Sequence, residues 1–175
     1  TPSFAARWLM PRIGAFWKAH PDVPLTLHPD EGLVDIAGGT ADLAIRFGRG
    51  GWPGVESARL LDVSFAVVAT PALLGGRTDL TADAMAALPW LIEEDWPEQL
   101  VYLRTLGLDP DSLTITRMTT SELLISAVRQ GYGLAPAIST YVEEDVASGR
   151  LTLLHRAPGD GLSYYLCTRP GAAKG

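Results

Sequence analysis

Cysteine is almost absent from this 175-residue sequence, in which Cys167 stands alone. One thiol excludes an internal disulfide framework and a cluster of thiolate metal ligands, and it fits a reducing, cytoplasmic setting. The sequence also lacks an apolar run near the roughly 20 residues that a membrane span requires. No charged-then-apolar signal peptide stands at its start. These absences argue against a disulfide-stabilised secreted protein and an integral membrane protein.

Positive charge is scarce and dispersed. The 14 Lys and Arg residues face 20 Asp and Glu residues, so the formal net charge is −6. A surface that grips nucleic-acid phosphates needs a basic stripe, and the basic residues here are scattered singly. We therefore expect no DNA contact from this chain itself. Fixed-period repeats and low-complexity tracts are also missing, which argues against solenoids and disordered linkers.

What is present is the composition of a folded domain, with 47% hydrophobic residues. Helical spacing of apolar residues predicts a helix over residues 1–20, capped by Thr1 or Ser3 and kinked at Pro11. A strand is predicted over 23–28, a short helix over 33–38 and a strand over 41–48. Together these three elements predict a βαβ unit with a right-handed crossover.

The pattern continues with a long strand-forming stretch over residues 55–70 and restarts after Pro71. Helices are expected over 80–88, 96–107, 119–131 and 139–149, the last capped by Ser139 or Thr140, and strands over 89–94, 113–118, 133–138, 151–154 and 163–168. Alternating strands and helices predict an α/β fold with mostly parallel sheets. The restart near residue 70 predicts two lobes.

Motifs for chemistry are weak. The loop GRGGWPG at 48–54 has Pro53 where the last glycine of GxGxxG would stand and no helix after it, so it predicts a turn. His28, Asp30 and Glu31 match no known metal spacing, and a GxSxG nucleophile elbow is missing. We expect no enzyme activity, no metal and no cofactor.

Three segments carry a family resemblance: PSFAARWLMPRIGAFWKAHPDVPLTL, LVDIAGGTADLAIRFGRGGWPG and TTSELLISAVRQGYGLAPAI. In this order and spacing they resemble the effector (substrate)-binding domain of LysR-type transcriptional regulators, closest to the branch of the glycine-cleavage and β-lactamase regulators. At both ends the sequence departs from the family's pattern, because the family's first strand and last helix have no counterpart in it. Its winged helix-turn-helix and linker helix have none either.

The resemblance implies a fold like type II periplasmic binding proteins, in which two Rossmann-like lobes are joined by two crossing strands. Lobe I would comprise 1–67 with 158–175, and lobe II 68–157, with crossings near 65–70 and 158–163. The ligand would lie between the lobes. It would be a small, anionic effector, and the protein would be a homodimer or homotetramer that reaches DNA through its missing N-terminal domain.

Hydroxyl groups at two helix starts are the first candidate ligand contacts. Ser3 begins the first helix, with Phe4 beside it, and Thr119, Thr120 and Ser121 begin the helix of the third segment. Unpaired N–H groups and the helix dipole favour anions at such ends. The alternative for each is plain capping, which needs no ligand.

Three further residues are candidates. The resemblance places Asp35 at a cleft aspartate of the β-lactamase regulator, although an exposed structural carboxylate is the alternative. Arg46 ends a strand at the edge where parallel sheets hold ligands, and it could bind a carboxylate or pair with Asp35 or Asp42. Tyr164 resembles an aromatic that the family places near the cleft, and core packing is its alternative. Tyr164 and Tyr165 must point to opposite faces.

The leading interpretation is a ligand-sensing regulatory domain. A periplasmic solute-binding protein and a dehydratase- or deaminase-like enzyme on the same fold are the alternatives. A dimer is also expected from the first helix, whose apolar residues spread over about 240° at roughly 100° per residue, more than one sheet can cover. The partner's helix over 119–131 would meet Trp17 or Met10.

Overall fold

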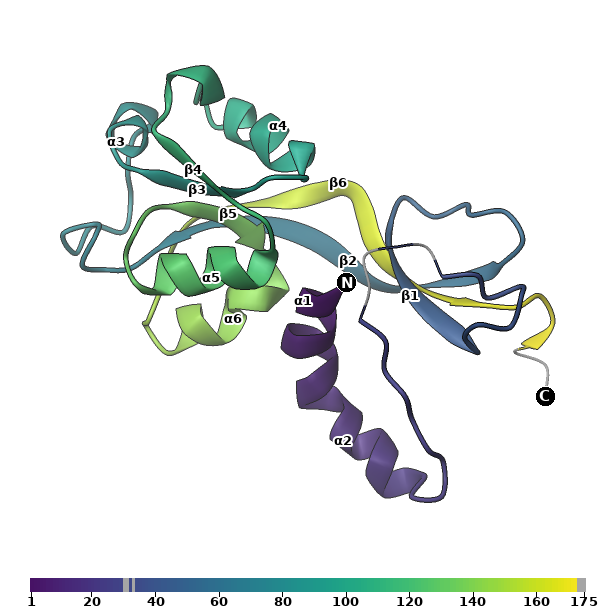
Figure 1. Cartoon of the computed structure of the whole chain (residues 1–175). Helices are drawn as coiled ribbons and strands as arrows, with labels where there is room; N and C mark the ends of the chain where they lie inside the picture. The colour runs from purple at the N-terminus through teal and green to yellow at the C-terminus, as the bar shows by residue number, and fades with distance from the viewer. Residues whose placement is uncertain (30–31, 33, 173–175) are drawn as a thin grey trace. The chain divides into compact units, whose positions relative to one another are not determined.

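The computed structural model describes residues 1–29, 32 and 34–172. It divides into two compact units: unit 1 comprises Thr1–Val63 and Pro158–Gly175, and unit 2 comprises Ser64–Ala157. The lobes expected from the sequence were 1–67 with 158–175, and 68–157, so the first boundary differs by four residues. Figure 1 traces the chain through both units in sequence colours.

Unit 2 is an α/β unit built on parallel strands. β3 (Trp90–Glu93) pairs in parallel with β4 (Ile115–Met118), and a parallel bridge joins Trp90 to Leu134, just before β5 (Ala135–Ile138). The helices between them are α3 (Ala82–Ala86), α4 (Pro97–Thr105), the 3-10 turn η2 (Pro110–Ser112), α5 (Ser121–Arg129) and α6 (Ser139–Ala147). Figure 1 shows α5 and α6 on one side of the strands and α3 and α4 on the other.

The core of unit 2 is built from both its strands and its helices. Trp90, Leu103, Ile125 and Leu134 are almost completely buried, and each comes from a different element or connection. Strands covered on both faces read as continuous apolar runs, as in PWLIEE and GLAPAI. The expected α/β layering is therefore present here.

Two long strands belong to both units. β2 (Glu56–Ala69) and β6 (Thr152–Thr168) lie side by side in a sheet of order β1-β6-β2-β5, whose first strand is β1 (Leu43–Gly48). β1 pairs antiparallel with the end of β6, and β5 pairs antiparallel with the end of β2. Two expected strands, 151–154 and 163–168, belong to one continuous strand, which passes through Gly161 at positive φ. The prediction of mostly parallel pairing holds for unit 2 and is wrong for this sheet.

The first helix is broken into three pieces. α1 (Pro2–Phe4) leads into a π-helical turn η1 (Ala5–Leu9) and then α2 (Met10–Ala19). The wide turn lies directly before Pro11, whose ring cannot tolerate the carbonyl four residues earlier and whose nitrogen donates no hydrogen bond. The irregularity expected at Pro11 thus takes the form of a π turn. The expected cap is absent, because the Thr1 side chain makes no capping bond and Ser3 lies inside the helix.

The βαβ unit expected near the N-terminus does not form in the described residues. Residues 23–29 carry no strand pairing, and Val23, Leu25 and Leu27 are about two-fifths exposed. Residues 36–39 form a turn instead of a helix, and Leu33 lies outside the described residues. Alternating apolar residues favour a strand, but a strand exists only where a neighbouring backbone accepts its hydrogen bonds.

The start of α6 also differs from expectation. Its N-cap residue is Ile138, with no side-chain cap, and the hydroxyls of Ser139 and Thr140 are buried without a hydrogen-bond partner in the described structure. By contrast, the 48–54 loop is a turn as expected, with Gly50, Gly51 and Gly54 at positive φ.

Candidate functional site

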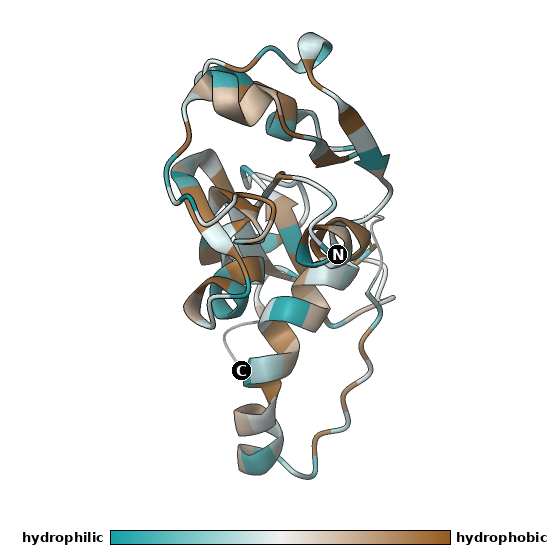
Figure 2. Cartoon of the chain, turned by 90° about the vertical axis from the view of Figure 1, so that its left-hand side faces the viewer, coloured by the Kyte–Doolittle hydropathy of each residue, from teal (hydrophilic) through white to brown (hydrophobic). Residues whose placement is uncertain are grey.

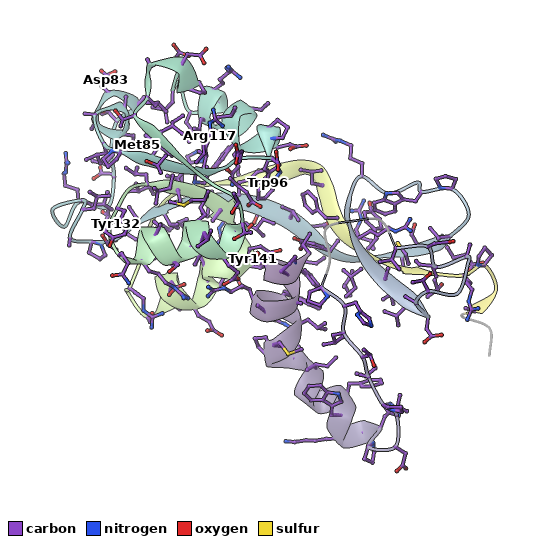
Figure 3. All side chains as sticks on the ribbon, in the orientation of Figure 1. Asp83, Met85, Trp96, Arg117, Tyr132 and Tyr141 are labelled. Atoms are coloured by element: carbon purple, nitrogen blue, oxygen red, sulfur yellow. The ribbon has the colours of Figure 1, made fainter. Side chains whose placement is uncertain are left out.

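The carboxyl ends of the parallel strands of unit 2 meet at one edge. β4 ends at Met118 and leads into Thr119, Thr120 and α5, while β5 leads directly into α6. In open α/β sheets this edge is where ligands bind, because helix N-termini converge there. Figure 3 labels Trp96, just before α4, and Tyr141, in the first turn of α6, toward this edge, and Tyr132 at the opposite end of the unit.

Thr120 caps α5. Its Oγ1 accepts a hydrogen bond of 3.2 Å from the backbone N–H of Leu123, and its backbone is extended, as an N-cap requires. The capping interpretation is therefore correct for Thr120. Its O–H proton is not used by that bond, so the same hydroxyl can still donate to a ligand. Thr119 is exposed beside it.

Ser121 has a different partner. Its Oγ donates a hydrogen bond of 2.5 Å to the Oε2 of Glu93, the last residue of β3. The short distance is typical of a hydroxyl that donates to a charged carboxylate. The sequence interpretation missed Glu93, although an acidic residue at the carboxyl end of a buried parallel strand was a usable signal.

Gln99 of α4 fixes the end of β3. It is 1% exposed; its Oε1 accepts a bond of 2.7 Å from the Glu93 N–H, and its Nε2 donates one of 2.9 Å to the Pro136 carbonyl. The Gln99 amide thus satisfies a backbone N–H of β3 and a backbone carbonyl of β5, where the two strands no longer bond to each other directly. Glu93 is held in place through its backbone, and its carboxylate remains half-buried at the edge.

A tyrosine–histidine pair lies deeper in unit 2. The Tyr102 hydroxyl is 2.8 Å from Nδ1 of His155 on β6, and the ring stacks on Phe65 at 5.4 Å. Burial raises the pKa of Tyr102 to about 12. The phenol stays protonated at neutral pH, and the pair packs α4 against β2 and β6.

In unit 1, Ser3 and Phe4 are both buried, at 6% and 2% exposure. The Phe4 ring contacts Trp8 at 4.9 Å and Tyr164 at 4.3 Å. Tyr164 also contacts Phe47, its cross-strand neighbour on β1. The structure thus joins two of the predicted residues, Phe4 and Tyr164, in one aromatic cluster.

Arg46 lies on the other face of the same sheet. It pairs with Tyr165 across β1 and β6, and side chains alternate along a strand, so Arg46 and Tyr164 face opposite ways. Arg46 donates from Nη2 to the Val34 carbonyl at 3.0 Å and lies over the Trp52 ring at 5.7 Å. The salt bridges expected with Asp35 or Asp42 do not form.

Cys167 lies on the Arg46 face, in an apolar cluster with Ile36 and Tyr165. Burial raises the pKa of this thiol, and the positive charge of Arg46 offsets part of that increase. A buried thiol with a raised pKa is a poor nucleophile, so this face contains an inert cysteine.

Asp35 closes a turn. Its Oδ1 accepts a bond of 2.8 Å from the Gly38 N–H, its carbonyl accepts one from the Thr40 N–H, and the residue is exposed. A Cβ on Gly38 would press against the Asp35 carboxylate, which would have to move aside and give up its bond to the Gly38 N–H. These contacts give Asp35 a structural role in the turn.

In the part of the chain that the structure describes, no group of three or more His, Cys, Asp and Glu residues is placed to hold a metal. Asp30 and Glu31, which were weighed with His28 as metal ligands, lie outside the described residues. None of the described helices has the length and apolar character to cross a bilayer.

Comparison with known proteins decides the family. The model of the LysR substrate binding domain matches residues 1–174. The chain belongs to this family. Members of the LysR family are regulators, and the relatives of this LysR domain carry regulator names, which confirms the expectation that it is not an enzyme. The expected two-lobed α/β fold of type II periplasmic binding proteins is also confirmed.

Three matches illustrate the relationship. The LysR domain is 45% identical over 170 residues to the AhcY transcriptional activator HvrB of Rhodobacter capsulatus, with 97% of this chain and 58% of that protein covered. It is 30% identical to the glycine cleavage system transcriptional activator of Escherichia coli K12, covering 86% and 50%. The effector domain of AmpR of Pseudomonas aeruginosa superposes with a TM-score of 0.77 at 27% identity, covering 97% and 82%. The chain thus spans little more than half the length of such full-length relatives.

Proposed function

We propose that this chain is the effector-sensing half of a LysR-type transcriptional regulator that acts in the cytoplasm. A small molecule with an anionic group would bind this domain, and a DNA-binding part outside the chain would respond. The observation that carries the proposal is the family match over residues 1–174, together with relatives that are named transcriptional activators. The acidic net charge supports the assignment of DNA contact to another part of the protein.

The contact residues that we propose come from both units. In unit 1, Ser3 and Phe4 lie in α1 and Tyr164 lies on β6. In unit 2, Thr119, Thr120 and Ser121 lie where β4 leads into α5. Asp35 and Arg46 are two further contacts that we propose, and each also has a structural partner in unit 1. Regulation would be a population shift, and a near-complete change of state needs about 5 kcal/mol of differential effector affinity.

A homodimer is part of this proposal. α2 exposes Met10, Phe16 and Trp17 at 38–45%, and α5 exposes Leu123 at 52%. Figure 2 shows apolar residues recurring along the α2 helix. Large exposed apolar side chains on two helices are typical of a self-association surface, and a two-fold contact of α2 with the partner's α5 would cover both.

Effector binding is tested by thermal denaturation of the protein with a panel of cytoplasmic metabolites. A true effector at a hundred times its Kd stabilises the folded state by about 2.7 kcal/mol, which raises Tm by several degrees. Thr120→Ala should weaken binding by roughly fivefold or more, as for a lost hydrogen bond. Thr81→Ala, which removes the equivalent cap of α3, is the matched control. A panel without a single stabilising compound contradicts the proposal.

A further inference from the structure

The wide turn η1 sets the direction of the side chains that precede it. One of its hydrogen bonds runs from the Met10 N–H to the Ala5 carbonyl, five residues back instead of four. A turn with one extra residue rotates the helix before it relative to the helix after it by about 100°, which is one residue of a regular α-helix. Phe4 therefore points in a direction that it would not have in a regular helix over residues 2–19.

The residues on the two sides of η1 differ in burial. Ser3 and Phe4 are 6% and 2% exposed, whereas α2, which the structure describes in full, contains no buried residue. The centre of the Phe4 ring lies 4.3 Å from that of Tyr164 and 4.9 Å from that of Trp8, which belongs to the wide turn. The turn thus holds Phe4 against Tyr164, and both rings are contacts that we propose for the effector.

Two neighbouring residues hold the turn in this form. In a regular α-helix the Pro11 ring would clash with the Arg7 carbonyl, four residues earlier, and Pro11 has no N–H to donate. Arg12 donates from Nη1 to the Trp8 carbonyl at 3.0 Å, and its guanidinium lies 4.9 Å from the centre of the Trp8 ring. Pro11 therefore disfavours the α-helical form of the segment, while Arg12 fixes the backbone and the ring of Trp8.

This arrangement lowers stability. A proline inside a helix removes a hydrogen bond, and alanine at the same position would be more favourable. π turns are rare and are frequent at functional sites. We propose that Pro11 and Arg12 are positioning residues for the effector site, because through η1 they direct Phe4 onto Tyr164. This inference rests on the proposed effector function and adds two residues that need not touch the effector.

The first test is Pro11→Ala, which restores the N–H and allows a regular α-helix. It should raise Tm by several degrees, because the helix gains a hydrogen bond, and yet weaken binding roughly tenfold or more, because Phe4 turns away from Tyr164. The probe is the carboxylate or phosphate of the metabolite panel that raises the Tm of the parent protein most, and calorimetric titration measures its Kd. Pro24→Ala, in the exposed segment after α2, should neither raise Tm nor change that Kd.

A second readout needs no effector. In protein labelled with fluorotryptophan, the fluorine resonance that disappears in Trp8→Phe is that of Trp8. Pro11→Ala should shift this resonance, because the Phe4 ring no longer stacks on Trp8. The resonance of Trp90, which is buried in unit 2, should stay in place.

Arg12→Met keeps the apolar stem of the side chain and should weaken binding of the same probe several-fold. Lys18→Met, at an exposed position of the same helix, should not. If Pro11→Ala leaves either the Trp8 resonance or the Kd unchanged, the positioning role is overturned and the effector function stands. An unchanged Kd in Arg12→Met overturns the part assigned to Arg12. If no compound stabilises the parent protein, the effector function is overturned, and the positioning role is overturned with it.

Discussion

At the scale of single residues, Asp145 is a buried charge that two arginines satisfy. It is 0% exposed, and it accepts bonds from Nε and Nη2 of Arg129 and from Nη1 of Arg150. The cluster joins α5 to α6 and to the start of β6. Breaking a buried ion pair is costly because the partner charges lose their counterion.

Asp145→Asn should therefore lower the free energy of unfolding by about 2–3 kcal/mol, somewhat less than for a fully buried pair, because both arginines retain contact with water. Urea denaturation at pH 7 measures the change. Glu144→Gln, an exposed acidic neighbour, should differ from the parent by less than about 0.5 kcal/mol. Equal effects of the two substitutions would contradict the stabilising role of the cluster.

Tyr102 predicts a pH dependence at the alkaline end. Its pKa rises from 10.0 to about 12 on folding, so the unfolded chain loses the phenolic proton first. The stability due to this shift is complete below pH 10 and falls by roughly 2–3 kcal/mol as pH rises to 12. Tyr102→Phe should flatten that decline in urea denaturation, whereas Tyr132→Phe, at a 65% exposed position, should leave it unchanged.

At the scale of elements, local signals predicted unit 2 well. Pro97 in the first turn of α4, Thr120 at the cap of α5 and Gly131 after its end all act within a few residues. The strand predicted over residues 23–28 does not form, because a strand depends on a pairing partner that the sequence pattern does not reveal. The position of Glu93 at the end of a buried strand could have been noticed, but its bond to Ser121 could not, since that bond joins positions 28 residues apart.

Two glycines differ in the space around their backbone, one in α2 and the other in β6. A Cβ on Gly14 of α2 meets nothing within 4 Å, whereas one on Gly159 of β6 would lie 2.7 Å from the Val63 carbonyl of β2. Gly14→Ala should raise stability by about 0.5–1 kcal/mol, because alanine is the better helix former. Gly159→Ala should lower it by about 1–3 kcal/mol through overpacking. Denaturation curves in which the two variants shift in the same direction would refute this packing argument.

At the scale of the whole molecule, self-association is the open prediction. The exposed apolar side chains of α2 should be covered by a second copy, so sedimentation at micromolar concentration should give twice the mass of 18.7 kDa. Trp17→Glu should shift the protein toward monomer, because it places a charge in that contact. Ala19→Glu, which adds the same charge at an exposed helix position, is the control. A monomeric parent protein excludes the dimer.

The net charge of −6 leads to another prediction for the whole chain. On its own it should not bind duplex DNA at physiological salt, because a phosphate-binding surface requires clustered positive charge. Electrophoretic mobility shifts across a salt series test this. Submicromolar binding that weakens steeply with added salt would contradict it.

The path of the chain through the two units has a mechanical consequence. Both ends belong to unit 1, and unit 2 is one uninterrupted insertion reached only through β2 and β6. Tension applied between the ends reaches unit 2 only after the bonds of unit 1 around these strands have ruptured. When the molecule is stretched in an optical trap, the two units should therefore unfold in a fixed order, unit 1 first and unit 2 second.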